Sequence, residues 1–183
     1  MQNDMNLAGE IEKAIAACSF TAFGYIDTEC LRYHPEVRKI CEGNVCRNYS
    51  TSWACPPAVG TLEECRARVE QYSTMLLFSK KYDLEDSFDL EGMTNGLVGF
   101  KKAVDIFDEK LRKILPAFLL LSNEGCGRCK QCTYPDAPCR FPHLAIPSME
   151  AYGLVVSQVC QDSGLPYYYG PRTITYTACV LVD

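Results

Sequence analysis

The chain has 183 residues, of which 48% are hydrophobic and 22% charged, a composition typical of one globular domain. Its formal net charge of -5 leaves no basic surface for a phosphate backbone, which argues against nucleic acid as a partner. No apolar run is long enough to cross a bilayer, and residues 1–10 lack the basic and apolar regions of a signal peptide, so we expect a single cytoplasmic domain over residues 1–183 that does not bind membranes.

Hydrophobic periodicity predicts helices and strands in alternation along the chain. Apolar residues at intervals of three and four indicate helices over residues 6–18, 36–40, 62–71, 97–114 and 148–163. Short apolar and β-branched runs indicate strands over residues 20–26, 74–79, 117–121 and 173–182, and residues 80–91 are expected to be a charged, solvated connection. This order predicts an α/β fold, a sheet of about four strands with flanking helices and right-handed crossovers.

Details within these elements support the assignment. Thr61-Leu62-Glu63-Glu64 is a capping box that begins the third helix. Asp108 and Arg112 are one turn apart in the fourth helix and are expected to pair on its exposed side. Ser148 is expected to cap the last helix.

The twelve cysteines divide into two groups by their sequence surroundings. Cys18, Cys65, Cys160 and Cys179 fall on or beside apolar stripes, which predicts core positions. The others lie in loops rich in glycine and proline. Because disulfide frameworks are typical of short secreted chains, we expect the clustered loop cysteines to be metal ligands instead.

The strongest ligand candidates lie in the segment Gly125-Cys126-Gly127-Arg128-Cys129-Lys130-Gln131-Cys132, followed by Cys139. Three cysteines at two-residue spacing wind the backbone around one point, so their thiolates converge on one inorganic body while loop amides point at its sulfides. That arrangement is typical of iron–sulfur clusters. In the bacterial ferredoxin run the fourth cysteine follows after three residues and a proline comes next, whereas here six residues intervene before Cys139. Arg128, Lys130 and Arg140 either offset the negative charge of a cluster or are exposed loop cations.

A second ligand set is Cys41-x4-Cys46-x8-Cys55-Pro56-Pro57. The two prolines fix the chain direction directly after Cys55, so the loop leaves the site at once. Tyr49 and Trp53 either shield a cluster from water or belong to the core. Both cysteine loops follow strands or precede helices, and we expect two metal loops near one end of the sheet.

The order of these motifs resembles a known family. It runs through Cys41-x4-Cys46, Trp53-Ala54-Cys55-Pro56-Pro57, Gly125-Cys126-x2-Cys129-x2-Cys132, Pro138-Cys139-Arg140-Phe141-Pro142 and Pro147-Ser148-Met149-Glu150-Ala151-Tyr152-Gly153. The chain is similar, from about residue 20 onward, to the family called predicted metal-binding protein, domain of unknown function 2284. The resemblance implies binding of a metal or cluster and carries no established reaction.

The loop cysteines number seven, whereas two four-cysteine clusters need eight. Either Cys30 or, as a weaker candidate, His34 is the eighth ligand, or one iron has no protein ligand and is open to substrate or water. A fully ligated pair indicates an electron carrier, and an open iron indicates an oxidoreductase. If Cys139 instead bound the cluster held by Cys41, Cys46 and Cys55, the iron without a protein ligand would belong to the other cluster. We favour the open iron, because Cys30 lies well outside an otherwise compact loop.

The function predicted from these observations is that of a cytoplasmic protein with one or two 4Fe-4S clusters, in electron transfer or as a small reductase component. Its partner would be a redox protein or a small-molecule substrate. The alternative is a zinc-binding structural or interaction module without catalytic activity, although three cysteines at this spacing overfill one zinc knuckle. Because the sequence has no nucleotide-binding or serine-hydrolase motif and only two histidines, the cysteines are expected to carry the function.

Overall fold

A four-stranded antiparallel sheet is the centre of the protein, seen here in a computed structural model that describes the backbone of residues 2–183 and the side chains of residues 7–183. The strands are β1 (Ala22–Asp27), β2 (Thr74–Asp83), β3 (Leu119–Ser122) and β4 (Thr173–Val182), in the order β1-β2-β4-β3. β2 and β4 pair over their full length, from Thr74 opposite Val182 to Asp83 opposite Thr173. The predicted α/β fold and its four strands are confirmed.

The expected crossovers between neighbouring strands are not found, because every neighbouring pair is antiparallel. β2 and β3 do run in the same direction and are joined through the helix α4 (Leu90–Ile114), but β4 lies between them. The alternation of strands and helices predicts the order of elements along the chain. It does not reveal that the last strand inserts between two earlier ones.

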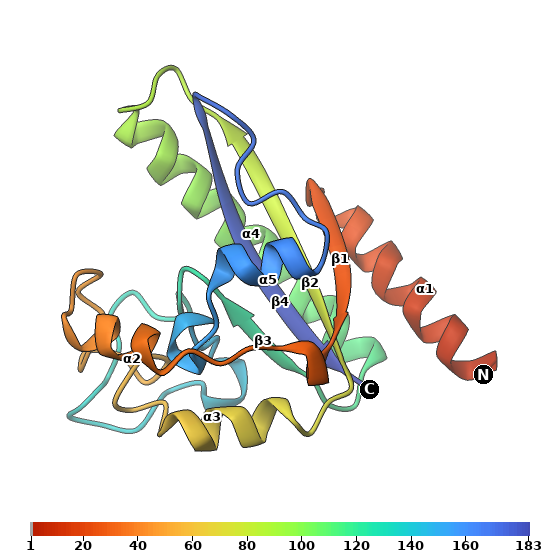
Figure 1. Ribbon diagram of the computed structural model, residues 1–183, viewed down its shortest axis with the longest axis horizontal. Coiled ribbons are helices and arrows are strands. Elements are labelled where there is room, and N and C mark those ends of the chain that lie inside the picture. Colours follow the sequence, from red (N-terminus) through yellow and green to blue (C-terminus); the bar gives the residue numbers. More distant parts are fainter. Residues whose placement is uncertain (1) are drawn as a thin grey trace.

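Helices cover both faces of the sheet (Figure 1). α1 (Gln2–Ala17) and α4 lie on one face, and α3 (Leu62–Val69), α5 (Val156–Asp162) and the short 3-10 helix η3 (Glu150–Tyr152) lie on the other. Side chains of β2 alternate between the two cores: Leu76 and Phe78 pack under α4, and Leu77 packs under α3 and α5. This explains the uninterrupted apolar run of the strand. No helix among residues 2–183 is long and apolar enough to cross a membrane.

The connection before α4 is shorter than predicted. β2 continues to Asp83, and α4 begins at Leu90, where the carboxylate of Asp89 accepts a hydrogen bond of 2.7 Å from the N–H of Gly92. Gly96 therefore lies inside the helix. A Cβ there would come within 3.0 Å of the Tyr82 ring, so glycine permits the close packing of α4 on the sheet.

The helix predicted over residues 148–163 is broken in the structure. The hydroxyl of Ser148 does accept a hydrogen bond of 3.0 Å from the N–H of Ala151, but the turn it caps is only η3. Gly153 follows with φ of 73°, a left-handed conformation that ends the turn, and α5 begins at Val156. Because apolar side chains on both pieces are buried against one core, the periodicity alone does not reveal the break.

Candidate metal centre

Four cysteines belong to the core, as their apolar surroundings predict. Cys18, Cys65, Cys160 and Cys179 are all buried. Burial raises the pKa of Cys160 to about 11 and also raises that of Cys179, which keeps both thiols protonated. The Cys65 thiol donates to the carbonyl oxygen of Val59 at 3.8 Å. None of the twelve cysteines forms a disulfide in this structure.

The seven loop cysteines line two different cavities. Cys41, Cys46 and Cys55 line a cavity of about 630 Å³, the three-cysteine cavity. A much narrower one, about 30 Å³, is the four-cysteine pocket, which is lined by Cys126, Cys129, Cys132 and Cys139. Cys139 thus lies with its own run rather than with the Cys41 loop.

Neither eighth-ligand candidate lines these cavities. Cys30 is exposed at the end of the short 3-10 helix η1 (Thr28–Cys30), and the Nδ1 of His34 lies 3.0 Å from a carboxylate oxygen of Glu36. Among the side chains of residues 7–183, no three His, Cys, Asp or Glu groups converge closely enough to hold an ion as they stand. The ligand role of the seven cysteines therefore stays a prediction.

Arg128 anchors the four-cysteine loop to α4. Its guanidinium reaches Asp105 and lies 2.6 Å from a carboxylate oxygen of Asp108, while its Nε donates to the carbonyl oxygen of Leu144 at 2.8 Å. Only 12% of the Arg128 side chain and 2% of the Asp108 side chain are exposed. Arg128 is therefore not an exposed loop cation, and its charge is already paired with Asp105 and Asp108. Asp108 also pairs with Arg112, as predicted, but it is buried rather than on the exposed side of the helix.

Lys130 and Arg140, the other two cations of this loop, are exposed. This agrees with the interpretation of them as exposed loop cations. Arg140 donates to the carbonyl oxygen of Gln131 at 2.8 Å and so ties the two ends of the loop together. This hydrogen bond closes the loop that contains Cys132 and Cys139.

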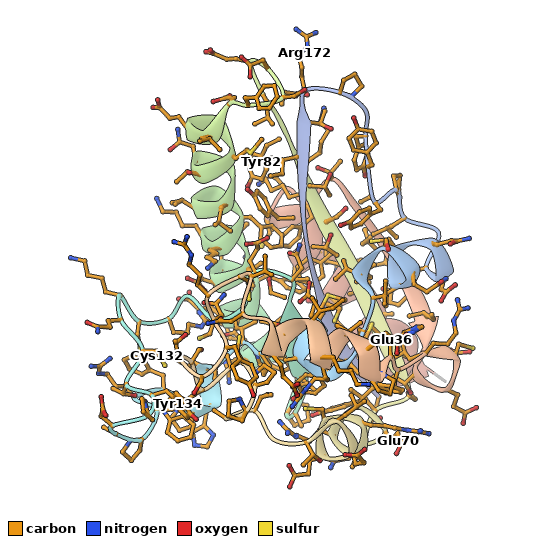
Figure 2. The ribbon with its side chains drawn as sticks, turned by 60° about the vertical axis from the view of Figure 1, so that its left-hand side comes forward. Glu36, Glu70, Tyr82, Cys132, Tyr134 and Arg172 are labelled. Atoms are coloured by element: carbon orange, nitrogen blue, oxygen red, sulfur yellow. The ribbon has the colours of Figure 1, made fainter. Side chains whose placement is uncertain are left out.

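Cys132 lies among hydrogen-bond donors (Figure 2, where it is labelled beside Tyr134 at the end of the molecule opposite Arg172). Its partial burial raises the thiol pKa, but hydrogen bonds from the backbone N–H groups of Tyr134, Trp53 and Thr133 and from the hydroxyl of Ser52 outweigh it, so the pKa is lower than that of an ordinary cysteine. These donors favour the thiolate, the form that binds metals.

Two of those donors come from the other cysteine loop, through Ser52 and Trp53. The indole N–H of Trp53 donates to the carbonyl oxygen of Ala137 at 3.1 Å, and its ring meets that of Tyr134 edge to face at 4.9 Å. Trp53 therefore packs the first loop on the second, at the wall of the four-cysteine pocket. The two loops lie side by side at one end of the molecule (Figure 1).

The three-cysteine cavity is assembled from segments in both halves of the chain. Cys41 lies in α2 (Pro35–Glu42), Cys46 and Cys55 lie in the loop that follows, and η3 closes the cavity from the far end of the chain. The guanidinium of Arg38 joins all three, because it donates to the carbonyl oxygen of Ala151 in η3 and, at 2.7 Å, to that of Gly60.

The electrostatics of this cavity oppose negative charge. Burial raises the pKa of Cys55 to about 12, and the neighbouring Cys46, Cys41 and Glu150 add to the effect. Burial likewise raises the pKa of Glu150 to about 7, even though the Ser148 hydroxyl donates to its Oε2 at 3.1 Å. The pKa of Glu124, also in the wall, is raised by burial against the opposing charge of Lys101.

Glu124 and Glu150 are absent from the ligand sets predicted from sequence. Glu150 lies in the Pro147–Gly153 stretch that contributes to the resemblance, and Glu124 directly precedes the Gly125-Cys126 motif, but the sequence assigned a role to neither. Of the described residues that line the three-cysteine cavity, none is Lys, Arg or His. Three thiols and two carboxylates without a cation make a donor set that fits a metal ion or a cluster.

The comparisons with known proteins agree with this donor chemistry. A family model described as "Predicted metal-binding protein (DUF2284)" matches residues 24–182, which contain both cavities. No curated protein and no solved structure matches the chain. The match confirms the resemblance predicted from the cysteine motifs.

Proposed function

Because this chain belongs to the family of predicted metal-binding proteins, we propose that it is an iron–sulfur protein with a 4Fe-4S cluster in the four-cysteine pocket and a second centre in the three-cysteine cavity. Clusters of this type supply one-electron transfer when bound. The protein would act in the cytoplasm as an electron carrier or as a small reductase component, with a redox protein or a small molecule as its partner.

The observation that carries this proposal is that Cys126, Cys129, Cys132 and Cys139 line one pocket together. Within that pocket, hydrogen bonding from the backbone of Tyr134, Trp53 and Thr133 and from the Ser52 hydroxyl lowers the pKa of the Cys132 thiol. Donors to sulfur stabilise the extra electron of a reduced cluster, and protein hydrogen bonds are one of the means by which cluster potentials are set. The spacing of Cys126, Cys129 and Cys132 favours a cluster over a single zinc ion for the same pocket.

The three-cysteine cavity supports the role of reductase component. Its volume of about 630 Å³ falls in the range of small-molecule sites, and its wall includes Val37, Leu154 and Tyr167 beside the thiols. These side chains would receive an apolar part of a ligand and exclude water. Asn123 and Asn48 supply amide groups that would orient its polar part.

Metal analysis of the protein purified without oxygen tests the proposal. We expect iron and acid-labile sulfide in similar amounts, broad visible absorption that bleaches on reduction, and an electron paramagnetic resonance signal from the reduced protein. A colourless protein that holds zinc in stoichiometric amount, and that unfolds on chelation, would contradict the proposal and favour a zinc-stabilised module.

A further inference from the structure

We propose that the carboxylate of Glu150 is the fourth protein ligand of the centre in the three-cysteine cavity. The inference rests on the proposed function in one respect, that the cavity holds a metal centre, and it holds for iron or zinc alike. It assigns the position left open by the count of seven cysteines, and it replaces Cys30 and His34 as candidates.

The fold brings Glu150 to the cysteines through hydrogen bonds on both sides of it. On one side, the N–H of Ser148 donates to the carbonyl oxygen of Ala54, the residue before Cys55, at 3.2 Å. On the other side, Ala151 accepts from Arg38, which lies one helical turn before Cys41 in α2. Glu150 is therefore held between the two segments that carry Cys41 and Cys55, and it lines the cavity with both.

The position of Ser148 is itself fixed by the sheet. It forms a parallel bridge with Ser122, the last residue of β3, where the N–H of Ser122 donates to the carbonyl oxygen of Pro147 at 3.0 Å. Glu150 thus begins a short turn that is attached to a strand end and to two loops. A side chain held in this way needs little ordering to bind a metal.

The charge surroundings distinguish Glu150 from the other carboxylate of the cavity. Within residues 7–183, no side chain forms a salt bridge to Glu150, and its one side-chain partner is the neutral hydroxyl of Ser148. Glu124 has the nearby charge of Lys101. Because a buried carboxylate is costly without a cation, Glu150 is the group for which a bound metal supplies the missing partner.

A carboxylate at this position has a chemical consequence. Carboxylate oxygen is a harder donor than thiolate and suits iron less well, so the metal atom it binds would exchange this ligand more readily than the cysteines. Added thiols or small anions would compete at that atom. The centre in the three-cysteine cavity would therefore be the one that responds to external ligands, next to the apolar wall described above.

Three variants purified without oxygen test the assignment: Glu150→Ala, Glu150→Cys and the matched control Glu42→Ala, which removes an exposed carboxylate next to Cys41 that lines neither cavity. Iron, zinc and sulfide contents and the electron paramagnetic resonance spectrum are measured for each. We expect Glu150→Ala to lose or convert one centre and keep the other, and Glu150→Cys to keep both with one signal altered. Glu42→Ala is expected to match the original protein.

Unchanged metal content and spectra in Glu150→Ala would overturn the assignment, as would loss of both centres from a folded variant, since Glu150 does not line the four-cysteine pocket. Glu150→Gln keeps the shape of the side chain and is expected to give the same result as Glu150→Ala, with circular dichroism as the check on folding. If the protein holds zinc, the proposed function fails, and the Glu150 assignment is then tested by loss of about one zinc per chain from the variant.

Discussion

The two cysteine cavities use the same ligand type in opposite surroundings. The four-cysteine pocket comes mostly from one segment, residues 126–145, with backbone N–H donors at Cys132 and the exposed cation Arg140 in its wall. The three-cysteine cavity joins segments from both halves of the chain and has carboxylates and apolar side chains in its wall. Because N–H donors and cations stabilise added negative charge and carboxylates oppose it, we expect a centre in the first to be reduced more easily than one in the second.

The largest expected effect comes from removing one ligand of each cavity in turn. Cys132→Ser should lose about four irons per chain, those of the four-cysteine pocket, and Cys55→Ser should lose only the other centre. Iron analysis and electron paramagnetic resonance of the reduced proteins measure both. Cys30→Ser is the control, because Cys30 lines neither cavity and its loss should leave both signals intact. Loss of the same signal from both ligand variants would show that the cavities hold one shared centre.

Arg128 offers a test of how the four-cysteine loop is held. Arg128→Met removes one partner of a buried ion pair and leaves Asp108 without this cation, so we expect the free energy of unfolding to fall by about 3 kcal/mol. Denaturant titration of the metal-free protein measures it. Arg66→Met is the matched control: its pair with Glu70 is exposed, and its loss should leave stability nearly unchanged. Equal effects of the two variants would mean that Arg128 does not anchor the loop.

The contact between the cavities should give the smallest effect. Trp53→Phe keeps the ring packing on Tyr134 and removes the indole donor to Ala137, which should destabilise the protein by about 1 kcal/mol. We expect the four-cysteine centre to bleach faster in air, because the wall of its pocket is looser, and the other centre to bleach at its original rate. Absorption and resonance signals followed over time separate the two. A bleaching rate unchanged at both centres would show that Trp53 does not shield the pocket.

Much of the fold follows from local sequence. The capping box at Thr61 forms as predicted, with the Glu64 N–H donating to the threonine hydroxyl and the Glu64 carboxylate accepting from the Thr61 N–H. β4 has the predicted bounds, and the cysteines on apolar stripes are buried. These features depend on residues close together in sequence or on periodicity, and a short window of sequence contains both.

The sequence by itself determined the four-cysteine run, because ligands at two-residue spacing are placed by the local path of the backbone. Only the tertiary structure decided which cysteines share a cavity, and that Glu124 and Glu150 join Cys41, Cys46 and Cys55 there. Glu150 reaches that cavity because β3 pairs with Ser148 and Arg38 binds η3, contacts between residues 26 and 113 positions apart. A carboxylate in a short turn has no periodicity that marks it as a ligand. The role proposed for Glu150 depends on its lacking a cationic partner among the side chains of residues 7–183, which is a property of the packed molecule.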